Sequence, residues 1–118
     1  GYVGRVLVLN SGGVSMGVDI VRASAVTPDT PGFNSLLLVR HVADSARTLD
    51  EAVEVVASAQ RGTPWLYPVC DGGGKCAVLE TGKYSAPGEK FDPLQYVDNA
   101  QLKQALPSEA FFAAHSFE

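Results

Sequence analysis

The sequence has little of what marks a membrane, nucleic-acid-binding or metal-binding protein. No apolar run approaches the roughly 20 residues that span a bilayer. The nine lysines and arginines are scattered and are outnumbered by thirteen acidic residues, whereas surfaces for nucleic acid or anionic lipid need clustered basic side chains. The only two cysteines have no histidine near them in the sequence. We therefore expect no nucleic-acid partner, no membrane contact and no metal site.

What is present is an ordinary globular composition. The chain has 118 residues, 46% of them apolar and 19% charged, which suffices to bury a core. We expect residues 1–118 to form a single domain or a fragment of one. No sequence signal assigns a cellular compartment.

The order of patterns predicts an α+β fold. Val-rich runs around a turn predict a hairpin over residues 5–22, and a second hairpin is expected over 64–82. Between them, apolar residues at helical spacing predict a pair of helices over 34–61. A helical tail is expected over 96–114. Together these elements favour a four-stranded, largely antiparallel sheet with two helices packed on one face.

Local signals support these boundaries. Asn10–Gly13 is suited to a hairpin turn because Asn and Gly accept positive φ at low cost. Thr48 and Glu51 form a capping-box pattern at the start of the second helix. Arg61 and Gly62 are expected to mark its end.

The second hairpin contains both cysteines. Cys70 and Cys76 flank the loop "DGGGK" symmetrically, so they would lie opposite each other and close enough to bridge. The favoured interpretation is nevertheless two small buried thiols, since free cysteine is often buried. Pro68 is expected near a sheet edge or a bulge, because proline cannot donate to a ladder.

The first strand raises a problem of coverage. Val6–Leu9 is apolar without alternation, so this strand requires both of its faces to be covered. Two helices cover only one face of the sheet. The other face needs another sheet, a partner subunit or the remainder of a parent protein. We therefore expect the isolated chain to self-associate through this uncovered face.

The residues considered alone indicate no chemistry. Both glycine-rich loops lead into strands, whereas a phosphate-binding loop leads into a helix N-terminus. We therefore expect no bound cofactor. Ser11, His41 and Asp71 could be assembled into a hydrolytic triad, but no nucleophile-elbow pattern supports that arrangement.

Four segments, taken in order, carry a family resemblance. "VLNSGGVSMGVDI", "SLLLVRHVADSARTLDEAVEVV", "VCDGGGKCAVLETG" and "AAHSF" resemble successive motifs of the N-terminal-nucleophile (Ntn) hydrolases. The similarity is to the branch of acyl-coenzyme A:6-aminopenicillanate acyltransferase and the choloylglycine hydrolases. It runs from about residue 5 to the end of the chain, with Asp71, Gly74 and Glu80 in register with a strand-pair motif.

The resemblance implies an αββα sandwich, to which this chain would contribute one sheet and its helices. It also implies hydrolysis or acyl transfer at linear amide bonds of a small substrate. The family's nucleophile is an N-terminal Cys, Ser or Thr, and Asn side chains and backbone N–H groups stabilise the oxyanion. Gly1 has no nucleophilic side chain, so the nucleophile would lie outside this chain.

Two positions depart from the family pattern. Asp19 matches the first oxyanion Asn, and a carboxylate there would repel an oxyanion unless it were protonated. The last Asn falls on Ala114 or His115, of which only His115 could donate. Two alternatives to an amide hydrolase therefore stay open: a non-catalytic relative, or an unrelated small α+β module, used for binding or assembly. In every case the isolated chain is expected to be inactive.

Overall fold

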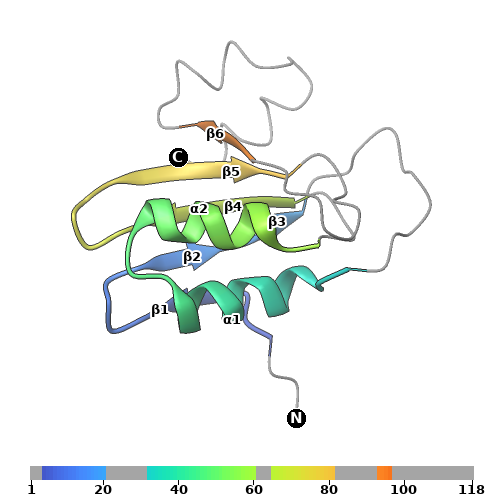
Figure 1. Ribbon diagram of the computed structural model, residues 1–118, viewed down its shortest axis with the longest axis horizontal. Coiled ribbons are helices and arrows are strands. Elements are labelled where there is room, and N and C mark those ends of the chain that lie inside the picture. Colours follow the sequence, from blue (N-terminus) through green and yellow to red (C-terminus); the bar gives the residue numbers. More distant parts are fainter. Residues whose placement is uncertain (1–3, 21–31, 61–64, 82–92, 97–118) are drawn as a thin grey trace.

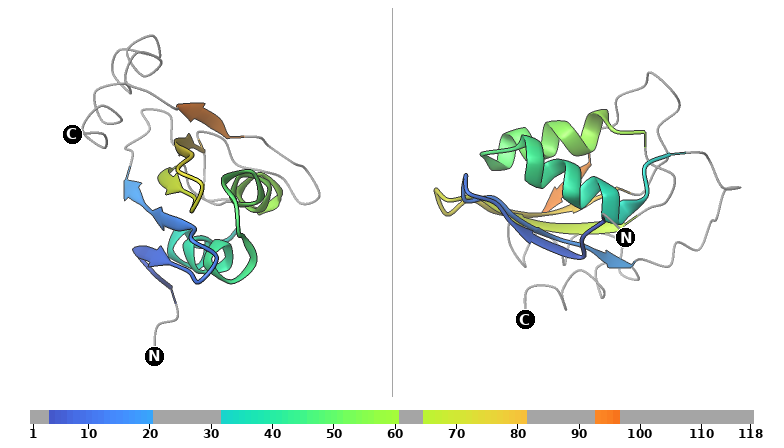
Figure 2. Two further views of the ribbon diagram at one scale, coloured as in Figure 1. Left: turned by 90° about the vertical axis from the view of Figure 1, so that its left-hand side faces the viewer. Right: turned by 90° about the horizontal axis from the view of Figure 1, so that it is seen from below.

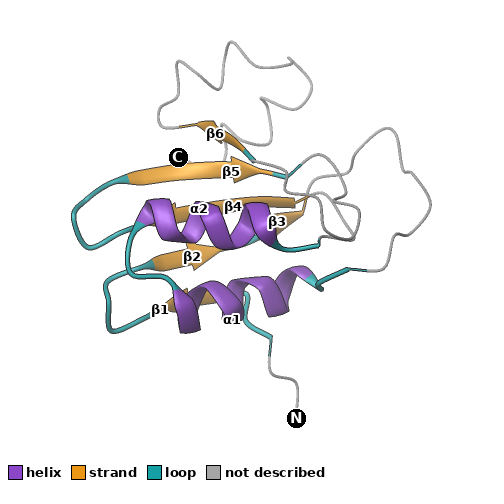
Figure 3. Ribbon diagram, in the orientation of Figure 1, coloured by secondary structure: helices purple, strands orange, loops and turns teal. Residues whose placement is uncertain are grey.

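The computed structural model describes residues 4–20, 32–60, 65–81 and 93–96. These residues form an α+β structure with two helices and six strands in one antiparallel sheet (Figures 1 and 3). In chain order the elements are β1 Leu7–Leu9, β2 Ser15–Gly17, β3 Asp19–Ile20, α1 Ser35–Ser45, α2 Leu49–Ser58, β4 Trp65–Cys70, β5 Cys76–Glu80 and β6 Leu94–Tyr96.

The sheet has the strand order β1-β2-β4-β5-β6, and β3 also pairs with β4. The antiparallel helices α1 and α2 lie side by side on one face of the sheet, as the side view shows (Figure 2). The predicted arrangement of an antiparallel sheet with both helices on one face is therefore confirmed. Both expected hairpins are present, as β1–β2 and β4–β5.

The core lies between the sheet and the helices. The sheet contributes alternate residues, because neighbouring side chains in a strand point to opposite faces. The helices contribute residues at three- and four-residue spacing. The largest fully buried side chains of this core are Tyr67, Met16, Leu38, Leu79, Val14, Val39, Val42, Val56 and Val69.

The sheet has two more strands than the expected four. β6 pairs with β5 through Leu94–Tyr96, where no strand was expected and where the predicted helical tail was to begin at residue 96. Residues 97–114 of that expected tail lie outside the described residues. The other additional strand, β3, results from an interruption of the strand that pairs with β4.

Pro68 lies at that interruption. β4 is an interior strand, so the expected edge position is wrong. Pro68 lies opposite Val78 of β5 in an unbroken ladder, whereas on its other side the ladder stops between Met16 and Asp19. The missing N–H of proline faces this gap, where a continuous ladder would need a donor.

The helix boundaries follow their capping residues. Asn34 caps α1 by accepting from the Leu36 N–H at 3.0 Å. Thr48 caps α2 by accepting from the Glu51 N–H at 3.2 Å, which confirms the predicted start. The predicted end of α2 is three residues too late. The helix stops at Ser58, because Ala59 is extended and the next carbonyl, that of Gln60, accepts from Phe33 N–H.

The face away from the helices is partly covered. Leu66 and Val78 point to this side and are buried. At β1, by contrast, Leu7 and Leu9 are 73% and 76% exposed, and the preceding Val6 is 63% exposed. Only Val8 of this strand packs partly against the core. The unalternating apolar run therefore leaves an exposed apolar patch, defined here as Val6, Leu7 and Leu9.

Candidate functional site

Two acidic side chains lie on the sheet face away from the helices. Asp19 of β3 pairs with Leu66 of β4, and Leu66 pairs in turn with Glu80 of β5. Because paired residues in a sheet share a face, Asp19 and Glu80 flank Leu66 on either side. Leu66 is buried, Asp19 is exposed and Glu80 is half-buried. The result is an apolar position between two acidic ones.

This row can accept hydrogen bonds or attract a cation, but an ionised carboxylate donates no proton to an oxyanion. Asp19 is the only one of the two predicted site residues that the structure places. His115 and the alternative position Ala114 lie outside the described residues. No group of three or more His, Cys, Asp or Glu side chains that could hold a metal occurs among the residues that the structure describes.

His41 belongs to a different region. It lies on the exposed side of α1, where its ring stacks on Phe33 with the centroids 5.9 Å apart and its Nδ1 is 3.3 Å from Ser45 Oγ. It borders a hollow of about 310 Å³ between the helices, lined by Phe33, His41, Glu54, Val55, Ser58, Ala59 and Gln60. Neither Ser11 nor Asp71 lines this hollow, so the structure gives no support to that triad.

The first hairpin turn is held by Asn10. Its Oδ1 accepts from the N–H groups of Gly12 and Val14, both at 3.0 Å. Its backbone N–H donates to Val14 O, and its carbonyl accepts from Gly13 N–H. Gly13 has φ +89°, a conformation that favours glycine. This is a three-residue hairpin loop closed by a glycine with positive φ.

The same residue joins the turn to the end of α1. Asn10 Nδ2 donates to the carbonyls of Ala43 and Ala46 at 3.0 and 2.7 Å. The last carbonyls of a helix have no partner within the helix. An amide donor supplied by the hairpin therefore satisfies the C-terminal end of α1.

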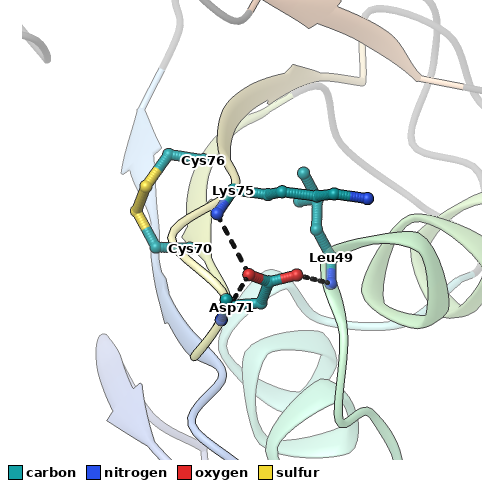
Figure 4. The surroundings of a disulfide bond; sticks show 6 residues. Leu49, Cys70, Asp71, Lys75 and Cys76 are labelled. Carbon is teal, nitrogen blue, oxygen red and sulfur yellow. Dashed lines mark hydrogen bonds between the residues drawn. A yellow bond between two sulfur atoms is a disulfide. The ribbon is translucent and has the colours of Figure 1, made fainter.

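The second turn repeats this geometry around Asp71. Its Oδ1 accepts from the N–H groups of Gly73 and Lys75 at 2.9 and 3.0 Å. Its backbone N–H donates to Lys75 O, its carbonyl accepts from Gly74 N–H, and Gly74 has φ +84°. Asp71 Oδ2 accepts from the first N–H of α2, that of Leu49, at 3.1 Å (Figure 4).

Asp71 is therefore an acceptor at a helix N-terminus, where N–H groups lack partners and negative charge is favoured. The hydrogen bond from Leu49 N–H and then that from Lys75 N–H lower the pKa of Asp71 below its ordinary value, with smaller contributions from Gly73 N–H and the Lys75 charge. Partial burial acts in the opposite direction and raises it less. The carboxylate is engaged by the backbone and is not oriented towards a catalytic histidine.

The two turns also contact each other. A Cβ added to Gly13 would lie 3.0 Å from Gly72 Cα, and one added to Gly12 would meet the side chain of Arg47. Glycine is needed where backbones approach so closely. The glycine-rich loops are therefore hairpin turns that pack against each other, and each leads into a strand as expected. Their amides at Gly12, Gly73 and Lys75 donate to side chains within the turns.

The cysteines are bridged, so the favoured interpretation of two buried thiols is wrong. Cys70 and Cys76 form a disulfide with their Cα atoms 4.1 Å apart. The neighbouring pair on the side of the turn, Asp71 and Lys75, is hydrogen-bonded. Because the two kinds of antiparallel pair alternate, Cys70 and Cys76 form a non-hydrogen-bonded pair, the kind with the shorter Cα–Cα distance. Cys70 is half-buried and Cys76 is exposed. The symmetric spacing around the loop was the signal for this bridge.

Sequence reasoning missed the role of Asn10 and Asp71. The signal was present, because "NSGGV" and "DGGGK" share an Asx residue followed three positions later by glycine. What the pattern did not contain was the helix end that each side chain reaches.

In the part of the chain that the structure describes, neither helix is long and apolar enough to cross a membrane.

The chain is similar to an uncharacterized protein of Archaeoglobus fulgidus, with 40% identity over 101 residues. The alignment covers 83% of this chain and 16% of that protein. The chain thus spans a small part of this much longer relative. No protein-family model and no solved structure matches the chain.

Proposed function

We propose that this chain is one sheet-and-helix layer of an Ntn-type enzyme that hydrolyses linear amides or transfers their acyl group. The nucleophile lies elsewhere in the longer polypeptide. The proposal rests on the sequence resemblance and on one feature of the fold. The sheet is covered by helices on one face, and at β1 it carries exposed apolar side chains on the other.

That feature fits a sandwich because a second sheet packs on such a face. Exposed Leu7 and Leu9 would be buried by it, with a gain of about 1.5–3 kcal/mol for each side chain fully removed from water. Asp19 lies on the same face as these residues, so it would face the interior between the two sheets. The matching region is 16% of the Archaeoglobus fulgidus relative. The remainder of that protein is long enough to contain a second sheet with its helices.

The proposed reaction proceeds through an acyl-enzyme. The nucleophile attacks the amide carbonyl carbon, the carbonyl oxygen becomes an oxyanion, and the amine leaves with a proton. Water or an acceptor amine then takes the acyl group. Asp19 as a carboxylate cannot stabilise the oxyanion, so backbone N–H groups or side chains outside the described residues must do so.

The test is amide hydrolysis by the protein expressed from its full reading frame, using a panel of small linear amides. We expect turnover that is lost when the N-terminal nucleophile is replaced. Asp19→Asn should keep or raise kcat, because the amide adds a donor, whereas Glu80→Gln is the matched control on the other side of Leu66. Absence of turnover on every amide would contradict the proposal.

Assembly without catalysis is the second candidate. The observation that favours it is the carboxylate of Asp19, which is exposed at the position where the family places an amide donor. Under this alternative the longer protein retains the two-layer packing but releases no amine from any amide. The isolated chain is inactive under both candidates, so only the full reading frame separates them.

A further inference from the structure

We propose that the Cys70–Cys76 disulfide is a reversible redox site whose state is transmitted to the N-terminus of α2 through Asp71. The inference does not use the proposed enzymatic activity, but Cys70 and Cys76 lie on the same sheet face as Leu66. It therefore requires that a second layer on this face leave the turn end of β4 and β5 uncovered. It rests on the accessibility of the bridge, on the hydrogen bonds of the adjacent residue and on a comparison of the two turns within the molecule.

The bridge is open to attack. The sulfur of Cys76 belongs to an exposed residue, whereas Cys70 is half-buried. Both lie on the side of the turn away from α2, and Asp71 points to the other side, towards Leu49 (Figure 4). A reducing dithiol can therefore approach the sulfurs without displacing the helix. Exposed disulfides exchange with external thiols more readily than buried ones.

The exchange balances as a two-electron step. A thiolate of the dithiol attacks Cys76 Sγ, and Cys70 leaves as a thiolate that takes up a proton. The second thiol of the reagent then attacks the mixed disulfide and releases Cys76. The dithiol ends as a disulfide, and both cysteines end as thiols.

Asp71 connects the bridge to the N-terminus of α2. Asp71 follows Cys70 directly and accepts from Leu49 N–H at 3.1 Å, from Gly73 N–H and from Lys75 N–H. The three residues between Asp71 and Lys75 are glycines, the residue type with the greatest backbone freedom. While the bridge is closed, the covalent link fixes both ends of this flexible loop. When the bridge opens, only the hydrogen bonds and the ladder hold Asp71 against the helix.

The Asn10 turn shows that this turn geometry forms without a disulfide. It has the same pattern of backbone and side-chain hydrogen bonds, and no disulfide closes it. The turn geometry therefore forms without a covalent link, and reduction is expected to loosen the second turn without unfolding it. The two turns make an internal comparison in which only one responds to redox state.

The experiment is amide hydrogen exchange on the full 118-residue chain, oxidised and after reduction with dithiothreitol, followed residue by residue by NMR. Reduction should accelerate exchange at Leu49, Gly73 and Lys75 by roughly tenfold. Gly12 and Val14 of the other turn should change much less, because their acceptor is Asn10 Oδ1. The double substitution Cys70→Ser with Cys76→Ser should reproduce the reduced pattern without any reagent.

Asp71→Asn tests the transmitting residue. Its amide nitrogen would face Leu49 N–H, donor against donor, while its oxygen could still accept from Gly73 and Lys75. In this variant Leu49 should exchange fast in the oxidised protein and should not respond to reduction, while the turn amides still respond. Chemical-shift dispersion reports whether each variant is folded.

Three results would overturn the inference. The bridge could resist dithiothreitol until the chain is unfolded. Leu49 could keep its exchange rate after reduction. All amides, including those of the Asn10 turn, could accelerate equally, which would show global destabilisation in place of a local link.

Discussion

Asn10 and Asp71 occupy the same position in two turns of the same geometry, and their side chains reach opposite ends of consecutive helices. Asn10 donates to the last carbonyls of α1, and Asp71 accepts from the first N–H of α2. In both turns Oδ1 accepts from the amides two and four residues further on. The two side chains differ in the other atom at the δ position. Asn10 has the donor Nδ2 at the C-terminus of α1, and Asp71 has the acceptor Oδ2 at the N-terminus of α2.

This pairing predicts that the two residues are not interchangeable. Asn10→Asp would place a carboxylate against the carbonyls of Ala43 and Ala46, and should lower the free energy of unfolding by about 2 kcal/mol or more. Asp71→Asn should also lower the urea midpoint, because it removes the acceptor for Leu49 N–H. Urea unfolding followed by circular dichroism measures both. If Asn10→Asp unfolded like the unaltered chain, the assigned role of its Nδ2 would be wrong.

The lowered pKa of Asp71 predicts a pH dependence. A carboxyl whose pKa is lower in the folded state stabilises the fold above its unfolded pKa, which is about 3.9 for Asp. This stabilisation is lost as the pH falls from that value through the lowered folded-state pKa of Asp71. The difference in urea midpoint between the unaltered chain and Asp71→Asn should therefore be constant from pH 7 to about pH 5 and shrink below pH 4. A difference that grew on acidification would have the wrong sign.

Gly13 and Gly74, which both have positive φ, should differ in their tolerance of alanine. At Gly74 nothing lies within 4 Å of an added Cβ, so Gly74→Ala should cost only the backbone penalty of about 1 kcal/mol. At Gly13 the added Cβ would also lie 3.0 Å from Gly72 Cα, and the cost should exceed about 2 kcal/mol. Thermal unfolding of both variants gives the comparison. Equal destabilisation would mean that the turns do not touch.

The exposed apolar patch predicts a separation of stability from association. Replacing Leu7 and Leu9 with Ser should change the free energy of unfolding by no more than about 0.5 kcal/mol each, since both are largely exposed. The same double change should reduce self-association of the isolated chain, measured by light scattering at high concentration. The buried control Val42→Ala should cost about 2–3 kcal/mol. A strict monomer before any substitution would contradict the association.

Much of the fold could be predicted because its signals are local. The capping pair Thr48 and Glu51, the helical spacing after it and the turn at Asn10–Gly13 each depend on neighbouring residues. Glu51 departs slightly from the capping-box pattern, since its carboxylate accepts from Arg47 N–H at 2.6 Å. The break at Pro68 required knowledge of which strand lay beside it, and β6 required a partner that its own short sequence does not indicate.

The site was less predictable for a physical reason. Asp19 and Glu80 lie in the same cross-strand row only because β4 separates β3 from β5, and strand order is a long-range property. Predicting the disulfide required a decision between bridged cysteines and free thiols at Cys70 and Cys76, and their spacing is compatible with both. His115 is placed by the family resemblance alone, and it lies outside the described residues.

The most direct test of the proposed function is the intact mass and N-terminal sequence of the protein expressed from its full reading frame. The proposal predicts cleavage of a precursor to expose a new N-terminal Cys, Ser or Thr upstream of residue 1. A mature protein with no such cleavage and no exposed nucleophile would contradict an Ntn-type amidase and leave assembly as the function of this sheet.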